Sequence, residues 1–298
     1  MKMPGITLLE WQKRYGSERS CAKTLIKVRW PNGFQCPACG STKAYFIESR
    51  TLYQCSHCRH QVSMTADTLF HSTKVPLVKW FWAIYLMASD KGGVSALRIA
   101  KNVGVSWITA RNMLRKIRKA MADRDSIYRL ANLIEFDDTL VGGKRAGKRG
   151  RGAAGKRPVL VAVETREKGA GFVAMQAVDS VNKGTVRQFL AKHLKDGQTV
   201  KTDALSALNA VGETQEHQKK VTPPEQTSVW LPMVHIMIGN LKTFINGTFH
   251  GVSSNCLQEY LDEFCYRFNR RFWEPQLPLR LLNACLAHVP VKVAEFHA

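Results

Sequence analysis

The chain has 298 residues, which is enough for about two or three domains with a sizeable core. Its 44 Lys and Arg residues against 23 Asp and Glu give a net charge of +21, which indicates a polyanionic partner. No apolar run approaches the length of a membrane-spanning helix, and residues 1–16 lack the apolar block of a signal peptide. We therefore expect a cytoplasmic, nucleoid-associated protein that binds nucleic acid and no membrane.

Four cysteines near the N-terminus have the spacing of a zinc site. A short helical segment is expected over residues 1–32, and after it fifteen residues separate the pair Cys36 and Cys39 from the pair Cys55 and Cys58. Two CxxC pairs at this distance are typical of four thiolates around one zinc. A fragment this small cannot build a core, so zinc would supply its folding free energy. We predict a structural zinc ribbon over residues 33–62.

Residues 74–125 have the pattern of a helix-turn-helix region. The apolar run over residues 75–87 predicts a buried helix, and residues 94–111 predict a helix, a turn at Gly104 and a second helix capped by Ser106. Residues 91–122 contain eight Lys or Arg and no acid, which favours DNA binding over a plain helical hairpin. The side chains expected to contact base edges begin the second helix and are Trp107, Thr109, Arg111 and Asn112.

Residues 133–143 predict a β-strand that is interrupted by three carboxylates and ends in a glycine pair. Alternation places Glu135 and Asp137 on one face of this strand and Asp138 on the other. Acidic residues are poor strand formers, so either the strand is a solvated edge or the carboxylates have a function.

A glycine-rich basic segment over residues 142–157 follows the acidic strand. It is either a solvated, disordered loop or a loop that becomes ordered on DNA. Because it leaves directly from the acidic strand, we expect it to contact phosphates. The side chains concerned are Lys144, Arg145, Lys148, Arg149 and Arg151.

The segments downstream predict a mixed α/β sheet. Strands are expected over residues 157–164 and 171–179, then a helix over 183–194 and a strand over 198–203 that ends in Asp203. Strand-end residues of such a sheet share a crevice. In the helix expected from residue 232, His235 and Lys242 are seven positions apart and point the same way, whereas Asn240 does not. Two carboxylates and one further ligand can hold a pair of Mg²⁺ ions for phosphoryl transfer.

Taken together, these motifs resemble zinc-ribbon DDE-type transposases of bacterial insertion sequences. The likeness runs nearly end to end, through RWPNGFQCPACG, QCSHCRHQVSMTADTLF, the acidic strand, KTDALSAL and LPMVHIMIGNLKTFINGTFHG. It implies a multidomain α+β chain, with a ribonuclease-H-like α/β catalytic domain and a mixed sheet over residues 130–275, followed by a C-terminal tail over 276–298.

The resemblance also implies a catalytic site. Asp137 and Asp203 fall on the first two metal-binding acids, His235 on the third, and Lys242 on a companion lysine. The metal would be two Mg²⁺ or Mn²⁺ ions. The family commonly has Glu after the first Asp, where this chain has Asp138, so the roles of Asp137 and Asp138 could be exchanged. A His in the third position removes one negative charge, although neutral imidazole can bind a metal, and Asn240 is the fallback ligand.

The function implied is that of a transposase that binds the terminal inverted repeats of its element, cleaves double-stranded DNA and transfers the strand to a target, as a homo-oligomer on DNA. The first alternative is a DNA-binding regulator or inactive relic in which the carboxylates are structural. The second is a stand-alone metal-dependent nuclease.

Overall fold

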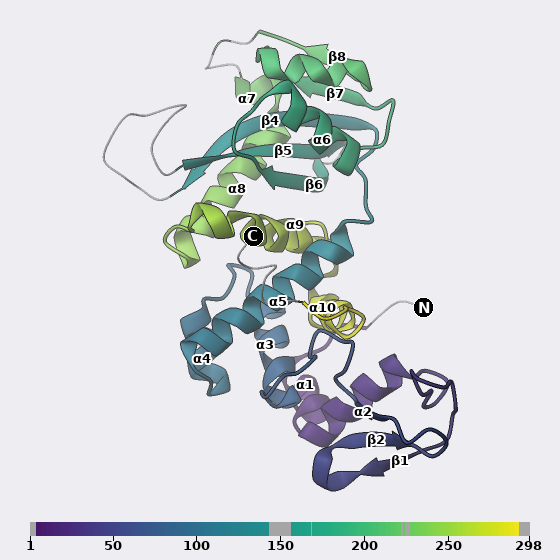
Figure 1. The fold of residues 1–298 in the computed structure, drawn as a ribbon. Helices are drawn as coiled ribbons and strands as arrows, with labels where there is room; N and C mark the ends of the chain where they lie inside the picture. Colours follow the sequence, from purple (N-terminus) through teal and green to yellow (C-terminus); the bar gives the residue numbers. More distant parts are fainter. Residues whose placement is uncertain (1–3, 143–155, 168, 222, 224–226, 292–298) are drawn as a thin grey trace. The chain divides into compact units, whose positions relative to one another are not determined.

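The computed structural model describes residues 4–142, 156–167, 169–221, 223 and 227–291. The basic segment with Lys144, Arg145, Lys148, Arg149 and Arg151 lies outside these residues. The chain divides into two compact units (Figure 1). Unit 1 is Met1–Ala120 with Trp273–Ala298, and unit 2 is Met121–Phe272. Every helix in the described part is too short or too polar to cross a bilayer.

The N-terminal part of unit 1 combines two capped helices with a small sheet. Helices α1 (Leu8–Tyr15) and α2 (Glu18–Arg29) each begin with a capping box, at Thr7 and Ser17. The strands β1 (Ala44–Ile47), β2 (Leu52–Cys55) and β3 (Gln61–Ser63) form an antiparallel sheet in that order, with the 3-10 turn η1 (Glu48–Arg50) in the β1–β2 connection. Strand β3 has three residues, which is too short for its alternation to give a signal in the sequence.

The helical part of unit 1 contains α3 (Leu77–Ser89), α4 (Ala96–Val103) and α5 (Trp107–Asp125), and α5 continues into unit 2. A left-handed turn at Gly104, with φ of +66°, separates α4 from α5. The C-terminal segment that we expected to be a tail contains helix α10 (Leu277–Leu286), preceded by the 3-10 segment η4 (Arg271–Gln276). Helix α10 packs against α3, because its leucines form a buried face rather than a solvated end.

Unit 2 is built on a five-stranded mixed sheet. Its strands are β4 (Leu133–Gly142), β5 (Lys156–Arg166), β6 (Gly169–Ala177), β7 (Thr199–Thr202) and β8 (Glu216–Lys219). They lie in the order β6-β5-β4-β7-β8, and β5 is antiparallel to both neighbours whereas β4, β7 and β8 are parallel. This is the strand arrangement of the ribonuclease-H fold, so the predicted fold class is confirmed. The polar residues of β8 gave no strand signal.

Helices cover both faces of this sheet (Figure 1). Helix α6 (Lys183–His193) and the 3-10 segment η2 (Ser206–Glu213) pack on one face, with Ile134 and Phe136 of β4. Helices α8 (Pro232–Thr248) and α9 (Leu257–Phe268) pack on the other, with Val141 of β4. Two short segments, α7 (Thr227–Trp230) and η3 (Ser254–Cys256), precede these two helices. Alternation along β4 therefore places Glu135 and Asp137 on the α8 side.

The free energy of unfolding should depend on pH through His193. Its ring packs 4.7 Å from the ring of Phe189, and burial lowers its pKa to about 4, with a further lowering from Lys192. The unfolded chain binds a proton at this residue below about pH 6.5, whereas the folded chain does so only near pH 4. Stability should therefore fall as the pH drops through this window.

We expect wild-type protein to lose about 1 to 2 kcal/mol more than His193→Phe between pH 7 and pH 5. Urea unfolding followed by circular dichroism measures this difference, and the ring-preserving variant controls for the titration of carboxyl groups. Equal losses of unfolding free energy in the two proteins would show that His193 has the same pKa in the folded and the unfolded chain.

Candidate active site and zinc ribbon

The register between β4 and β7 brings two distant aspartates to one level of the sheet. Leu133 lies opposite Thr199 and Glu135 lies opposite Lys201. Both pairs are 66 residues apart, and so are Asp137 and Asp203. Because parallel neighbours advance together, Asp203 follows the end of β7 at the level that Asp137 occupies on β4.

The carboxylates of these aspartates are held by backbone amides. Asp137 is 8% exposed, and its Oδ1 accepts a hydrogen bond of 2.8 Å from the amide of Asp138. Oδ1 of Asp203 accepts one of 3.1 Å from the amide of Leu205. Asp138 is on the face that α6 covers, by alternation, so the geometry favours Asp137 over Asp138 as the partner of groups on α8.

His235 comes to this point from the first turn of α8. Its Nε2 lies 3.9 Å from Oδ2 of Asp137, and this nitrogen is buried with no hydrogen-bond partner among the described residues. Burial lowers the pKa of the His235 imidazole, the Asp203 carboxylate raises it, and the Lys242 ammonium lowers it. The neutral ring that binds metal ions is thus the favoured form, and its unpaired nitrogen beside a carboxylate fits a divalent cation.

The three candidate ligands are nevertheless less tightly grouped than a bound metal requires. Over the described ranges, the four ribbon cysteines are the one set of three or more His, Cys, Asp or Glu side chains whose ligand atoms all lie within 4.8 Å. Lys242 is exposed on α8, and its charge reaches His235 across two helical turns. Asn240, the alternative ligand, is also exposed.

Glu135 is a functional candidate to which the sequence gave no role. It is 2% exposed, and its Oε2 accepts a hydrogen bond of 2.9 Å from the amide of Val234 at the start of α8. Burial raises the pKa of the Glu135 carboxyl, and the amides of Val234 and Met233 oppose the rise. The available signal was a strand carboxylate directed inward by alternation, together with a helix that begins at Pro232 without a capping side chain.

The four ribbon cysteines fit a zinc ion. Sγ of Cys36 lies 3.6 Å from Sγ of Cys58, and Sγ of Cys39 lies 3.6 Å from Sγ of Cys55. Tetrahedral coordination with Zn–S bonds of about 2.3 Å requires sulfur atoms about 3.8 Å apart. The thiols therefore already have the separation that one zinc demands.

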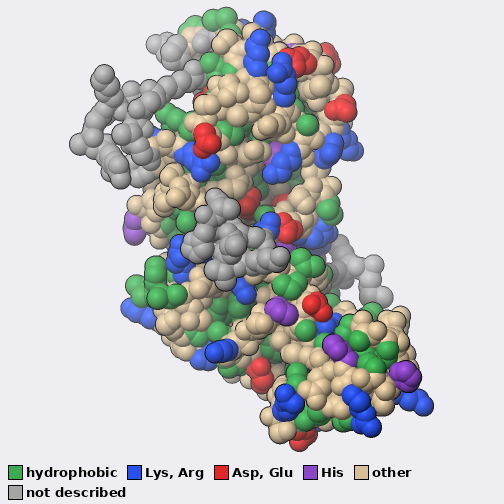
Figure 2. All heavy atoms as spheres, in the orientation of Figure 1, with side chains coloured by type: hydrophobic (Ala, Val, Ile, Leu, Met, Phe, Trp, Pro, Cys, Tyr) green, Lys and Arg blue, Asp and Glu red, His purple; other side chains and the backbone are tan. Residues whose placement is uncertain are grey.

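The helix-turn-helix region presents an open surface at the start of α5. Oγ of Ser106 accepts a hydrogen bond of 3.2 Å from the amide of Thr109, which is the predicted cap. Trp107 and Asn112 are exposed, and Arg111 is partly buried. Figure 2 shows Lys and Arg side chains scattered over the visible face of each unit and not gathered in one patch.

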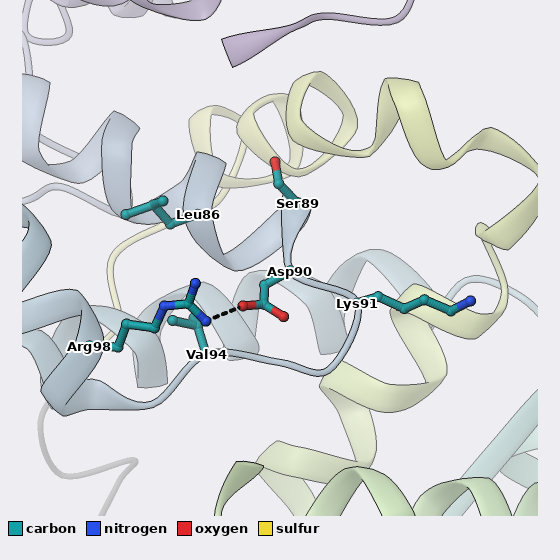
Figure 3. A pocket seen from close by; sticks show the side chains of 6 residues that line it. All are labelled: Leu86, Ser89, Asp90, Lys91, Val94 and Arg98. Atoms are coloured by element: carbon teal, nitrogen blue, oxygen red, sulfur yellow. Dashed lines mark hydrogen bonds and ion pairs between the residues drawn. The ribbon is translucent and has the colours of Figure 1, made fainter. Parts of the chain in front are cut away.

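A pocket in unit 1 is lined by none of the predicted site residues (Figure 3). It lies between the end of α3 and the start of α4, and an ion pair of 2.6 Å between Asp90 and Arg98 crosses it. Lys91 points away from that pair. The other lining residues are Leu86, Ser89 and Val94. A basic and apolar lining with one neutralised carboxylate offers no divalent-cation site.

Both the zinc ribbon and the domain with the acidic strand match known protein families. Residues 16–61 match the family described as a transposase zinc-ribbon domain, and residues 129–269 match the ISXO2-like transposase domain. In both regions the chain resembles zinc-ribbon DDE-type transposases. A curated relative of the chain is an uncharacterised protein in transposable element ISH50 of Halobacterium salinarum. It is 27% identical over 220 residues, which cover 67% of this chain and 72% of the relative.

Solved structures of Mos1 transposase are also similar to this chain. They include a pre-cleavage Mos1 transpososome (11% identity, 68% of this chain and 76% of that chain, TM-score 0.29). A Mos1 paired-end complex with the left transposon end is 12% identical, the match covers 69% of this chain and 77% of that chain, and the TM-score is 0.30. A mariner Mos1 paired-end complex with Mg is 11% identical, the match covers 68% of this chain and 77% of that chain, and the TM-score is 0.29. The fold assignment rests on the strand order and not on these scores.

Zinc removal should unfold the ribbon and leave unit 2 intact. The purified protein should contain one zinc per chain by atomic emission, and Cys39→Ser should lose most of it, because three thiolates bind more weakly than four. Hydrogen exchange should then accelerate over residues 36–58 and stay slow over 159–163. Cys256→Ser, a cysteine outside the cluster, is the control and should keep its zinc. Folded wild-type protein without zinc would contradict the assignment.

Proposed function

We propose that the chain is an active insertion-sequence transposase that cleaves the DNA ends of its element and joins them to target DNA. The observation that carries this is the position of His235 beside Asp137, on the level of the sheet that the strand register gives to Asp203. The shared offset of 66 residues supports the two aspartates, and the 3.9 Å between His235 Nε2 and Asp137 Oδ2 supports the histidine.

Asp137, Asp203 and His235 would hold the catalytic Mg²⁺ or Mn²⁺, a pair of ions in the family's chemistry. Such ions, when bound, polarise the scissile phosphate and activate a water or a 3′-hydroxyl. The unpaired Nε2 of His235 and its lowered pKa support its place in the donor set. With a neutral ring in place of a carboxylate the site has one negative charge fewer, so Mg²⁺ should bind more weakly than to three acids.

The remaining residues position the DNA. Lys242 is exposed two turns beyond His235, where its ammonium can contact a phosphate near the scissile bond as a point charge. The zinc ribbon (33–62) and the helix-turn-helix region (74–125) would hold the terminal inverted repeats, with Trp107, Thr109, Arg111 and Asn112 at base edges. In the catalytic domain (130–275), the basic loop with Lys144, Arg145, Lys148, Arg149 and Arg151 would bind phosphates. The chain would act on double-stranded DNA of the nucleoid as a homo-oligomer.

A DNA-binding relic is the second candidate, and it is favoured by one observation, the histidine in the position of the third acid. The carboxylates Asp137 and Asp203 do not favour it, because clustered acids without a metal repel one another and bring no benefit to a protein that only binds DNA. Strand joining in addition to cleavage distinguishes a transposase from a stand-alone nuclease.

Removing either aspartate should abolish cleavage and joining. We expect Asp137→Asn and Asp203→Asn to lose at least about 100-fold in rate while binding the element ends as tightly as wild type, because these carboxylates hold metal and not phosphate. Gel assays of cleavage and joining on an oligonucleotide end, beside a binding assay, measure both effects. Asp196→Asn, an exposed carboxylate, is the matched control.

The same assays decide the third ligand and the Asp137 and Asp138 assignment. His235→Ala should lose activity, Asn240→Ala should change it little, and His235→Glu should lower the Mg²⁺ concentration needed for half-maximal rate. If Asp138→Asn is inactive and Asp137→Asn is active, the roles of the two aspartates are exchanged. If all of these variants equal wild type, the site is not catalytic.

The basic loop should contribute phosphate contacts that are visible in the salt dependence of binding. The logarithm of the binding constant should fall with the logarithm of salt at a slope of about −0.9 per phosphate neutralised. The triple change of Lys148, Arg149 and Arg151 to Ala should flatten that slope and weaken binding to all sequences alike. Arg111→Ala should instead reduce the preference for the element ends.

The matched control removes three positive charges from the exposed residues Lys183, Lys192 and Lys195, on α6 and just after it. It should leave the slope near the wild-type value. A loop variant with an unchanged slope would mean that the loop is solvated and contacts no phosphate.

A further inference from the structure

Helix α8 begins without a cap of its own. Its N-cap residue Leu231 makes no side-chain hydrogen bond, and the first helical residue is Pro232. The free amides of a first helical turn need acceptors, and in a buried turn an unpaired amide is costly. Oε2 of Glu135 meets this need, since it accepts a hydrogen bond of 2.9 Å from Val234, and the amide of Met233 also stabilises the carboxylate.

Glu135 is itself held by the sheet. Its Oε1 accepts a hydrogen bond of 3.3 Å from the hydroxyl of Thr165 on β5. Lys201, its cross-strand neighbour on β7, acts on it electrostatically. Lys201 in turn lies with Nζ 4.9 Å from the ring of Trp230, whose Nε1 donates to the carbonyl of Thr202 at 2.9 Å. The carboxylate on β4 is thus held by groups from two neighbouring strands, β5 and β7, in addition to the amides of α8.

We propose that Glu135 is a positioning residue that fixes the start of α8 and thereby sets the separation of His235 from Asp137. The proposal rests on the function proposed above. Asp137 is two residues beyond Glu135 on the same strand face, and His235 is one residue beyond Val234. The Glu135–Val234 hydrogen bond is therefore a short link between the strand that carries one ligand and the helical turn that carries another. A first turn without its acceptor frays, and the imidazole then loses its place beside Asp137.

The surroundings of Glu135 argue against a role as a metal ligand. It is 2% exposed, and its two oxygens already accept hydrogen bonds from Val234 and Thr165. Glu135 acts on the reaction through α8 and not by contact with substrate.

Unit 1 contains a matched case of the same device. The N-cap residue of helix α3 is Pro76, which, like Leu231 of α8, makes no side-chain hydrogen bond to the helix. There Glu18 of α2 accepts hydrogen bonds of 2.8 Å from the amide of Leu77 and 3.0 Å from that of Val78. Because Glu18 and Asp137 belong to different units, Glu18 serves as a control for the loss of a helix cap alone.

Two conservative substitutions of Glu135 separate the effect of side-chain length from the effect of charge. Glu135→Gln keeps the length and one acceptor oxygen but removes the charge, whereas Glu135→Asp keeps the charge but is one methylene too short to reach Val234. A positioning role predicts that Asp is the more damaging change. A metal-ligand role predicts the opposite order.

Three measurements on DNA-free protein test this. Mn²⁺ affinity by calorimetry should fall by about 10-fold or more in Glu135→Asp and less in Glu135→Gln. Hydrogen exchange over residues 231–236 should accelerate in the same order, and the ¹⁵N resonances of the His235 ring should shift in that order without metal. Glu18→Gln and Glu18→Asp should lower the melting temperature and leave all three unchanged.

Each other outcome overturns the proposal. A larger Mn²⁺ loss in Glu135→Gln than in Glu135→Asp, with exchange unchanged, makes Glu135 a ligand. Faster exchange with unchanged Mn²⁺ affinity and His235 resonances makes it a stabilising cap only. Wild-type protein that binds no Mn²⁺ refutes the proposed function, and the His235 resonances of the two variants then decide the positioning role without metal.

Discussion

The pairing register of strand β4 is the constraint on which unit 2 depends. The strand is hydrogen-bonded on both sides, antiparallel to β5 and parallel to β7. Its alternation sends Ile134 and Phe136 into the core under α6 and sends Glu135 and Asp137 toward α8. A slip of one residue would exchange the two sets, burying carboxylates in an apolar layer and removing Asp137 from His235. The apolar residues therefore fix the acids in place, because the core tolerates one register.

Polar side chains form hydrogen bonds with backbone groups that the strands of this sheet leave unpaired. The edge strand β6 would expose unpaired backbone groups, and α9 supplies partners for them. Gln258 accepts from the amide of Ala177 and donates to the carbonyl of Met175, at 2.9 and 3.3 Å. Asn269 pairs in the same way with the amide and carbonyl of Val173, at 2.8 and 3.1 Å. Together with Glu135 at the start of α8, these side chains hold the two helices of one face in fixed positions against the sheet.

The two candidate metal sites differ in how they are assembled, and the difference explains what the sequence could predict. The ribbon site uses two CxxC pairs, each of which places both ligands in one turn, so spacing alone indicated the four thiolates. The acidic site uses single residues from β4, the end of β7 and α8. Spacing says little about whether such residues lie close together. Asp137, Asp203 and His235 were identified through the resemblance to a family, because periodicity by itself could not identify them. The resemblance gave no role to Glu135 or Glu18, and the sequence did not predict helix α10.

The sequence by itself determined the local features: the zinc spacing, the helix-turn-helix pattern, the alternation on β4 and the common direction of His235 and Lys242. These follow from periods of two and 3.6 residues and from fixed ligand spacings, which neighbouring residues decide. The ribonuclease-H-like fold class was implied by the family resemblance. Only the tertiary structure decided that β8 is a strand, that the C-terminal leucines form α10 on α3, and that Glu135 caps α8. Each of these depends on a partner far along the chain. A polar strand is stabilised by its neighbour, a leucine-rich segment by the surface it covers, and a buried carboxylate by amides that only folding brings to it.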